Sequence, residues 1–175
     1  MTYFEALQYP APRLRLDLDD LQKRFYARSR ELHPDRFARA PQAEQQAALD
    51  ASSVLNGAYR TLRHHVLRAE YVLKLSGFDV GEQRAPADLL EEVFDLNMAL
   101  EELQGGDESA RAQVDAARVK FEAMLGEIDS RLDGFYAAYD VAGDQAVLEK
   151  VRAELNRRRY VSNLIASASG ERVRH

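Results

Sequence analysis

The sequence predicts an all-α protein: an amino-terminal antiparallel helical hairpin with flanking short helices, followed by an antiparallel three-helix bundle. Three observations indicate this fold class. Residues of high helix propensity, chiefly Ala, Leu, Glu, Arg and Gln, dominate the 175-residue chain. Gly and Pro are few and clustered, and the alternating Val, Ile and Thr runs typical of strands are missing. Apolar residues recur at spacings of three and four, and their 46% share is sufficient for a packed core.

The first part of the hairpin is an amphipathic helix that carries positive charge. A short helix at residues 3–8 precedes it and ends at the loop that contains Pro10 and Pro12. Asp17 is a suitable N-cap for the amphipathic helix. Its apolar face carries Leu18, Leu21, Phe25 and Leu32. Its opposite side, which is either a solvated face or a binding surface, carries Lys23, Arg24, Arg28 and Arg30.

A His-Pro-Asp tripeptide ends this helix. Proline disfavours helical backbone for the residue before it, so the helix must stop near His33. The imidazole of His33 and the carboxylate of Asp35 are left on an exposed turn, where burial does not explain them. Such a turn beside cations favours recognition of a partner with an acidic surface. The alternative is a metal-dependent hydrolase that uses both side chains and a remote histidine, although no nucleophile or third ligand lies nearby.

A third helix completes the hairpin. After the turn of residues 33–40, Pro41 suits the first turn of a helix that continues to about Leu62. A further short helix at residues 66–75 ends with Gly77 as a suitable C-cap. We expect these segments to form the first domain.

Polarity and periodicity place the domain boundary. The first domain, with its linking helix, takes residues 1–78, and residues 79–85 form a polar connector. Residues 86–169 form the bundle, and residues 170–175 form a flexible tail. The seam of the first bundle helix carries Leu89, Val93, Leu96, Leu100 and Leu103. Glycine-containing breaks separate the three bundle helices at residues 105–107 and 143–144.

Composition excludes several classes of function. The formal net charge of −5 argues against general nucleic-acid binding and favours proteins as partners. The absence of cysteine excludes disulfides, thiolate zinc sites and cysteine-ligated iron–sulfur clusters within this chain, and no cofactor is expected. Neither a signal peptide nor a window of membrane-spanning length is visible, so we expect a cytoplasmic protein.

Six segments together resemble known proteins. The aromatic pair Tyr3-Phe4, the basic helix, the run from His33 to Phe37 and the run from Leu55 to Leu62 resemble a J domain. The runs Arg68 to Leu73 and Ser76 to Phe78 resemble one branch of J proteins, the HscB-type co-chaperones of iron–sulfur cluster assembly. The resemblance implies a J domain followed by a three-helix bundle.

This resemblance implies a mechanism without an active site of the chain's own. In J-domain proteins the basic helix and the His-Pro-Asp turn dock on an ATPase chaperone of the HscA/DnaK class and stimulate its ATP hydrolysis. By this interpretation the trigger is His33, Pro34 and Asp35. The docking charges are Lys23, Arg24 and Arg28, while Arg36 and Phe37 support the turn.

The second partner implied by the resemblance is the scaffold on which the cluster is built, a protein of the IscU type. Beside the buried seam of the helix that starts at Pro86 runs a second apolar strip, which is either buried on a wide face or exposed as an interface. Residues that match the family's scaffold-binding positions, or lie on this strip, are Leu90, Phe94, Asp95, Met98, Glu102 and Tyr160. Glu91 and Met98 depart from the usual methionine and glutamate of the family, and a J protein with a different client is the alternative.

Overall fold

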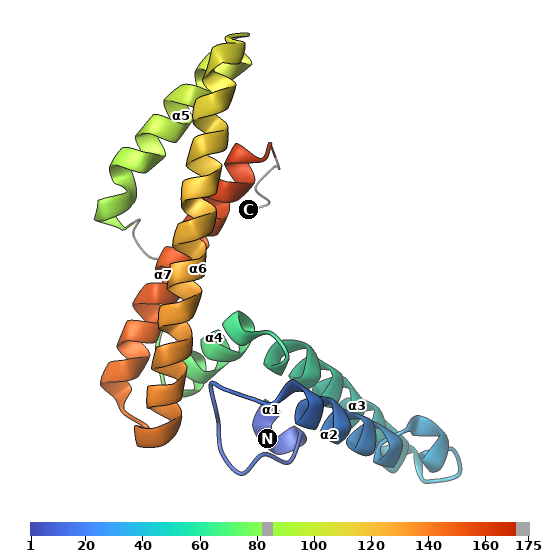
Figure 1. The fold of residues 1–175 in the computed structure, drawn as a ribbon. Coiled ribbons are helices and arrows are strands. Elements are labelled where there is room, and N and C mark those ends of the chain that lie inside the picture. Colours follow the sequence, from blue (N-terminus) through green and yellow to red (C-terminus); the bar gives the residue numbers. More distant parts are fainter. Residues whose placement is uncertain (82–85, 171–175) are drawn as a thin grey trace. The chain divides into compact units, whose positions relative to one another are not determined.

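The chain divides into two compact units, which we describe separately. The computed structural model describes residues 1–81 and 86–170 (Figure 1). The first unit comprises Met1–Asp79 together with Asp140–Ala142, and the second takes the remainder from Val80 onward. All regular elements of the described residues are helices, which confirms the predicted all-α class.

Two of the predicted segments fall partly outside the described residues. Of the predicted connector at residues 79–85, residues 82–85 are outside, and of the predicted tail at residues 170–175, residues 171–175 are outside. The boundaries drawn around these segments stay predictions.

The first unit is built around the hairpin of α2 and α3, which lie side by side in Figure 1. Asp17 caps α2 as predicted, because its carboxylate accepts hydrogen bonds from the backbone amides of Asp19 and Asp20 at 2.8 and 3.2 Å. Gly77 ends α4 with a positive φ of 82°, and the amide of Phe78 donates to the carbonyl of Leu73. The helices of this unit are α1 (Tyr3–Ala6), α2 (Leu18–Glu31), η1 (Pro34–Phe37), α3 (Gln42–Leu62) and α4 (His65–Leu75).

The core of the first unit joins α1, α2, α3 and α4. Its largest fully buried side chains are Phe4, Leu7, Leu14, Leu21, Leu55, Leu62 and Leu73. The predicted apolar face of α2 is wrong at one position, since Leu18 is mostly exposed. Leu18 is the first residue of α2, and its side chain leans toward the amino-terminal end, beyond the core that starts at Leu21.

The second unit is the predicted bundle of three helices. In Figure 1, α7 runs back along α6, and α5 lies beside the first part of α6. Gly106 and Gly143 have positive φ angles of 93° and 66° at the breaks between the helices, where side chains with a Cβ are strained. The helices of this unit are η2 (Ala87–Leu89), α5 (Leu90–Gln104), η3 (Glu108–Ala110), α6 (Arg111–Ala142) and α7 (Gln145–Ala168).

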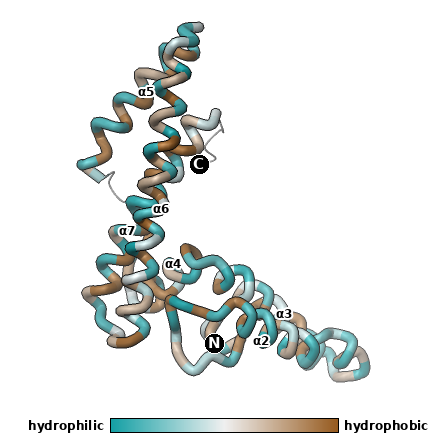
Figure 2. The backbone as a smooth tube through the Cα atoms, viewed as in Figure 1, coloured by the Kyte–Doolittle hydropathy of each residue, from teal (hydrophilic) through white to brown (hydrophobic). Residues whose placement is uncertain are grey.

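Apolar seams and ion pairs between neighbouring helices hold this bundle together. Hydrophobic and hydrophilic residues alternate along α6 and α7 in Figure 2, as amphipathic helices require. The buried seam residues include Leu89, Leu96, Phe121, Ile128, Leu132, Leu148 and Val151. Across the rim of α6 and α7, Arg158 contacts Asp129 at 2.6 Å and Arg131 contacts Glu154 at 3.1 Å.

Candidate functional site

The His-Pro-Asp turn forms a compact corner at the carboxyl end of α2. α2 ends at Glu31, and His33 then takes an extended conformation with φ −61° and ψ 128°, as a residue before proline should. Pro34 opens the single 3₁₀ turn η1. The imidazole Nδ1 of His33 accepts a hydrogen bond from the amide of Asp35 at 3.3 Å, which places the proton of a neutral ring on Nε2. The corner is thus rigid and locally ordered.

Both polar side chains of the corner point to solvent. The side chain of His33 is 58% exposed and that of Asp35 is 92% exposed. The His33 Nδ1 and an Asp35 carboxylate oxygen lie 3.5 Å apart. Such exposure leaves both groups available to another molecule, whereas a structural pair would be buried among its partners.

Two residues of α3 that the sequence interpretation missed hold the corner in place. The hydroxyl of Ser52 donates to the carbonyl of Leu32 at 2.9 Å, and the side-chain amide of Gln45 donates to the carbonyl of Ala40 at 2.9 Å. These bonds satisfy carbonyls at the end of α2 and in the turn that follows. Gln45 and Ser52 lie seven residues apart and therefore share one face of α3, which was the signal available in the sequence.

The predicted docking cations differ in their surroundings. Arg24 donates to a carboxylate oxygen of Asp20 at 2.7 Å and lies over the ring of Tyr9 at 4.5 Å, and Arg28 contacts Glu31. The hydrogen bond from Arg24 lowers the pKa of Asp20, while burial and Asp20 raise the pKa of Tyr9 to about 12. Arg24 and Arg28 thus already face carboxylates of the chain itself.

Two further cations near the corner, Arg30 and Arg36, form no ion pair within the described residues. The Nε of Arg30 donates to the carbonyl of Tyr26, and a guanidinium nitrogen of Arg36 donates to the carbonyl of Arg30, both at 3.4 Å. Lys23 is exposed on α2. Phe37, at the end of η1, is half-buried, which suits the supporting position predicted for it.

The geometry of the corner suits presentation to a partner rather than chemistry on a substrate. No group of three or more His, Cys, Asp or Glu side chains that could hold a metal ion occurs among the described residues. The hydrolase alternative therefore gains no support from the arrangement around His33 and Asp35. Among the same residues, no helix is both long and apolar enough to cross a membrane.

The second apolar strip of α5 is exposed. Leu90 is 57% exposed, Phe94 is 64% exposed and Met98 is 44% exposed, while Leu96 and Ala99 on the other side of α5 are buried. The side chains at positions 90, 94 and 98 follow one another at intervals of four, which places them in one row along the helix. Of the two alternatives for this strip, burial on a wide face is wrong.

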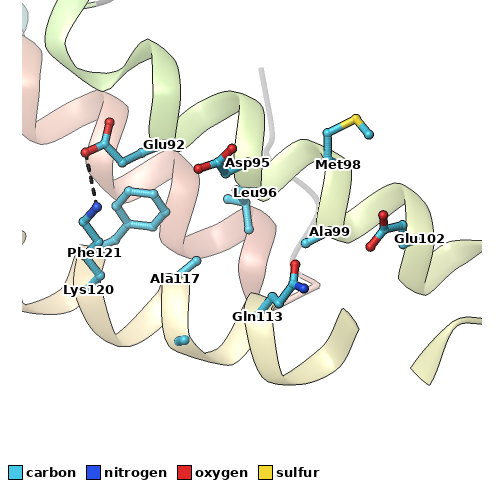
Figure 3. A pocket seen from close by; sticks show the side chains of 11 residues that line it. Glu92, Asp95, Leu96, Met98, Ala99, Glu102, Gln113, Ala117, Lys120 and Phe121 are labelled. Carbon is cyan, nitrogen blue, oxygen red and sulfur yellow. Dashed lines mark hydrogen bonds and ion pairs between the residues drawn. The ribbon is translucent and has the colours of Figure 1, made fainter. Parts of the chain in front are cut away.

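An acidic groove lies next to the strip, between α5 and α6 (Figure 3). It has a volume of about 430 Å³, and Asp95, Met98 and Glu102 line its α5 side. Lys120 on α6 reaches across to Glu92 at 3.2 Å, and a backbone hydrogen bond and this contact lower the pKa of Glu92. Three of the predicted scaffold-binding residues, Asp95, Met98 and Glu102, therefore line one groove. Met98 belongs both to this groove and to the exposed strip.

Tyr160 lies apart from that groove. It is half-buried on α7 and does not line the groove, and neither do Leu90 and Phe94. α6 also contributes to the groove through Gln113 and Ala117, which the sequence interpretation did not include. No sequence signal marked Gln113, because glutamine on a long amphipathic helix is an ordinary surface residue.

Comparisons with known proteins agree with this architecture. Residues 85–169 match the family described as the HSCB C-terminal oligomerisation domain. The chain is similar to the chaperone HscB from Vibrio cholerae, with a TM-score of 0.68 and 27% sequence identity over 97% of this chain and 96% of that chain. It shares its fold with the human co-chaperone protein HscB, with a TM-score of 0.66 and 24% identity over 99% of this chain and 83% of that chain. Residues 85–169 therefore carry the HSCB C-terminal domain, and the chain as a whole is similar to HscB co-chaperones.

Proposed function

We propose that this protein links an iron–sulfur scaffold to an ATPase chaperone. It binds a cluster scaffold of the IscU type through the second unit, delivers it to a chaperone of the HscA/DnaK class, and stimulates that chaperone's ATP hydrolysis through the His33 corner. The protein itself carries out no chemistry on ATP or on the cluster. The cytoplasmic location expected from the sequence stays a prediction.

The observation that carries the proposal is the exposure of both predicted interaction surfaces on one chain. The imidazole of His33 and the carboxylate of Asp35 are exposed, and α3 fixes their turn through Gln45 and Ser52. A rigid exposed turn loses little conformational entropy on binding, so little of the binding free energy from its contacts is offset.

The scaffold side of the proposal depends on the exposed strip of α5. A continuous row of apolar side chains costs solubility and marks a protein interface when it is rimmed by polar groups. Here the carboxylates of Asp95 and Glu102 rim the strip along the groove. We therefore assign the client surface to Leu90, Phe94 and Met98, with the two carboxylates setting orientation.

The trigger role is tested by the replacement His33→Gln. Glutamine keeps a polar side chain on an exposed turn but removes the ring, so the fold should persist while the contact is lost. We expect the stimulation of the cognate chaperone's steady-state ATP turnover to fall by about tenfold or more. His64→Gln is the matched control, because His64 is exposed and its side chain makes no capping hydrogen bond at α4.

The result would count against the proposal if His33→Gln stimulated as strongly as the wild type and as His64→Gln. A separate result would favour the alternative, a J protein with a different client. In that case the wild-type protein stimulates the chaperone, but a pull-down with it recovers no cluster scaffold.

A further inference from the structure

The amino end of α5 carries an anchor of the exposed strip but no side-chain cap. Leu90 is the first residue of this helix and is 57% exposed. Neither Leu89 at the N-cap of α5 nor Pro86 at the N-cap of η2 makes a side-chain capping hydrogen bond. Uncapped helix ends fray, and an end that becomes ordered only on binding lowers the affinity. The order of Leu90 in the free protein therefore depends on contacts from outside α5.

An arginine of α7 supplies such a contact. Arg157 reaches η2, where one guanidinium nitrogen lies 2.5 Å from a carboxylate oxygen of Asp88, and another lies 3.9 Å from the sulfur of Met124 on α6. Its side chain is 23% exposed, so most of its length is held against the bundle. A guanidinium is planar and presents its donors in a fixed fork, which suits it to joining segments in a set geometry. Since Asp88 precedes Leu90 by two residues, α6 and α7 are joined here to the start of the strip.

The same face of α7 carries Tyr160, the predicted scaffold-binding residue that lies apart from the groove. Arg157 and Tyr160 are three residues apart, so their side chains lie one above the other on the helix. Arg157 therefore connects the face that presents Tyr160 to the end of α5 that presents Leu90. The strip and Tyr160, which belong to different helices, are linked through the contact of Arg157 with Asp88.

The charge of α5 indicates what Arg157 contributes to binding. This helix has no cation and five carboxylates, which are those of Glu91, Glu92, Asp95, Glu101 and Glu102. A surface of this charge attracts a basic partner and repels an acidic one. Because a cation beside it weakens that attraction, the contribution of Arg157 to binding is one of geometry rather than of attraction.

We propose that Arg157 is a positioning residue of the scaffold site, because it orders the first turn of α5 through Asp88 and so presents Leu90 in a fixed place. The inference rests on the proposed function. Tyr160, on the same face of α7, then completes the surface that meets the scaffold, and Arg157 itself contacts only this chain. Ordering this end before binding reduces the conformational entropy that is lost in the complex.

Charge reversal tests this role by calorimetric titration with the scaffold. Arg157→Glu sets two carboxylates against each other, so the first turn of α5 should lose order and the affinity should fall about fivefold. The double variant of Arg157→Glu with Asp88→Lys restores the pair with reversed signs, and its affinity should return to within about twofold of the wild type. The matched control is Arg131→Glu, which reverses a cation of the ion pair between α6 and α7 and should leave the affinity unchanged.

Amide hydrogen exchange supplies a second readout that does not need the scaffold. The backbone amides of residues 90–94 should exchange faster in Arg157→Glu than in the wild type. They should exchange at the wild-type rate in the double variant and in Arg131→Glu. Circular dichroism verifies that every variant is folded.

Three results would contradict the inference, and only the last would also remove the scaffold side of the proposed function. Wild-type or higher affinity of Arg157→Glu, in a series where Leu90→Ala with Phe94→Ala loses binding, excludes the positioning role. A weakened Arg157→Glu that the double variant does not rescue, and whose amides exchange at the wild-type rate, shows that Arg157 contacts the scaffold directly. Absence of binding by the wild-type protein removes both proposals.

Discussion

Arg68 shows how a single residue ties three segments of the first unit together. It is the buried charged residue of the described core. Its Nε donates to the carbonyl of Leu14 at 2.7 Å, and another guanidinium nitrogen donates to the carbonyl of Leu62 at the end of α3. The loop before α2 and the last turn of α3 are thereby tied to α4. A buried charge of this kind persists only where its donors are satisfied.

Replacing this arginine tests that role. Arg68→Met keeps most of the aliphatic volume but leaves two buried carbonyls without their donor, so we expect a loss of about 2–4 kcal/mol in the free energy of unfolding. Urea denaturation followed by circular dichroism measures it. Arg39→Met, at an exposed position, is the matched control and should change stability by less than about 0.5 kcal/mol. Equal stability of the two variants would show that Arg68 is dispensable.

At the same scale, the paired arginines of α2 remain compatible with docking. Arg24 and Arg28 form ion pairs with partly exposed carboxylates, and such pairs contribute about 0–1 kcal/mol. A partner's carboxylate can therefore replace Asp20 or Glu31 at little cost. Their predicted role in docking stays a prediction.

Among the elements, α5 carries two faces with different tasks. Leu96 and Ala99 are buried within the bundle, and Leu90, Phe94 and Met98 are exposed. Stability of the bundle and affinity for the client should therefore be separable by mutation. The separation matters because a variant that merely unfolds says nothing about binding.

Truncating the exposed strip tests its assignment. Leu90→Ala combined with Phe94→Ala should weaken scaffold binding by about 30-fold or more, since two exposed anchors are lost and each is worth more than about 1 kcal/mol. The thermal midpoint should barely change, because neither side chain is in the core. Calorimetric titration with the scaffold measures the affinity, with Val119→Ala as the control on the exposed side of α6. Unchanged affinity in the double variant would exclude this surface.

Local rules in the sequence predicted the elements well. Asp17 and Gly77 marked helix ends because capping and positive φ depend on the residue itself. Burial was harder to predict, because it depends on neighbours that are distant in sequence. Leu18 matched the helical period but is exposed, and no local rule showed that Ser52 would bond to Leu32. The ion pairs between α6 and α7, such as that of Arg131 with Glu154, were undetermined for the same reason.

At the scale of the whole molecule, each unit has one proposed task. The corner of the first unit presents an imidazole, a carboxylate and nearby cations, while the strip of the second unit presents apolar side chains beside acidic ones. The two surfaces differ in charge and polarity, which directs them to different partners. The central claim is that both must reside on one chain, because the protein brings one partner to the other.

The most direct measurement of this claim is ATP turnover of the chaperone in the presence of scaffold, with the wild type or with a mixture of two variants. The mixture contains His33→Gln, which retains the strip, and the double variant Leu90→Ala and Phe94→Ala, which retains the corner. We predict that the wild type together with scaffold raises ATP turnover well above the sum of the increases that the protein alone and the scaffold alone produce. The reason is that tethering increases the effective concentration of one partner at the other. The mixture should not, and a mixture that matched the wild type would contradict the account.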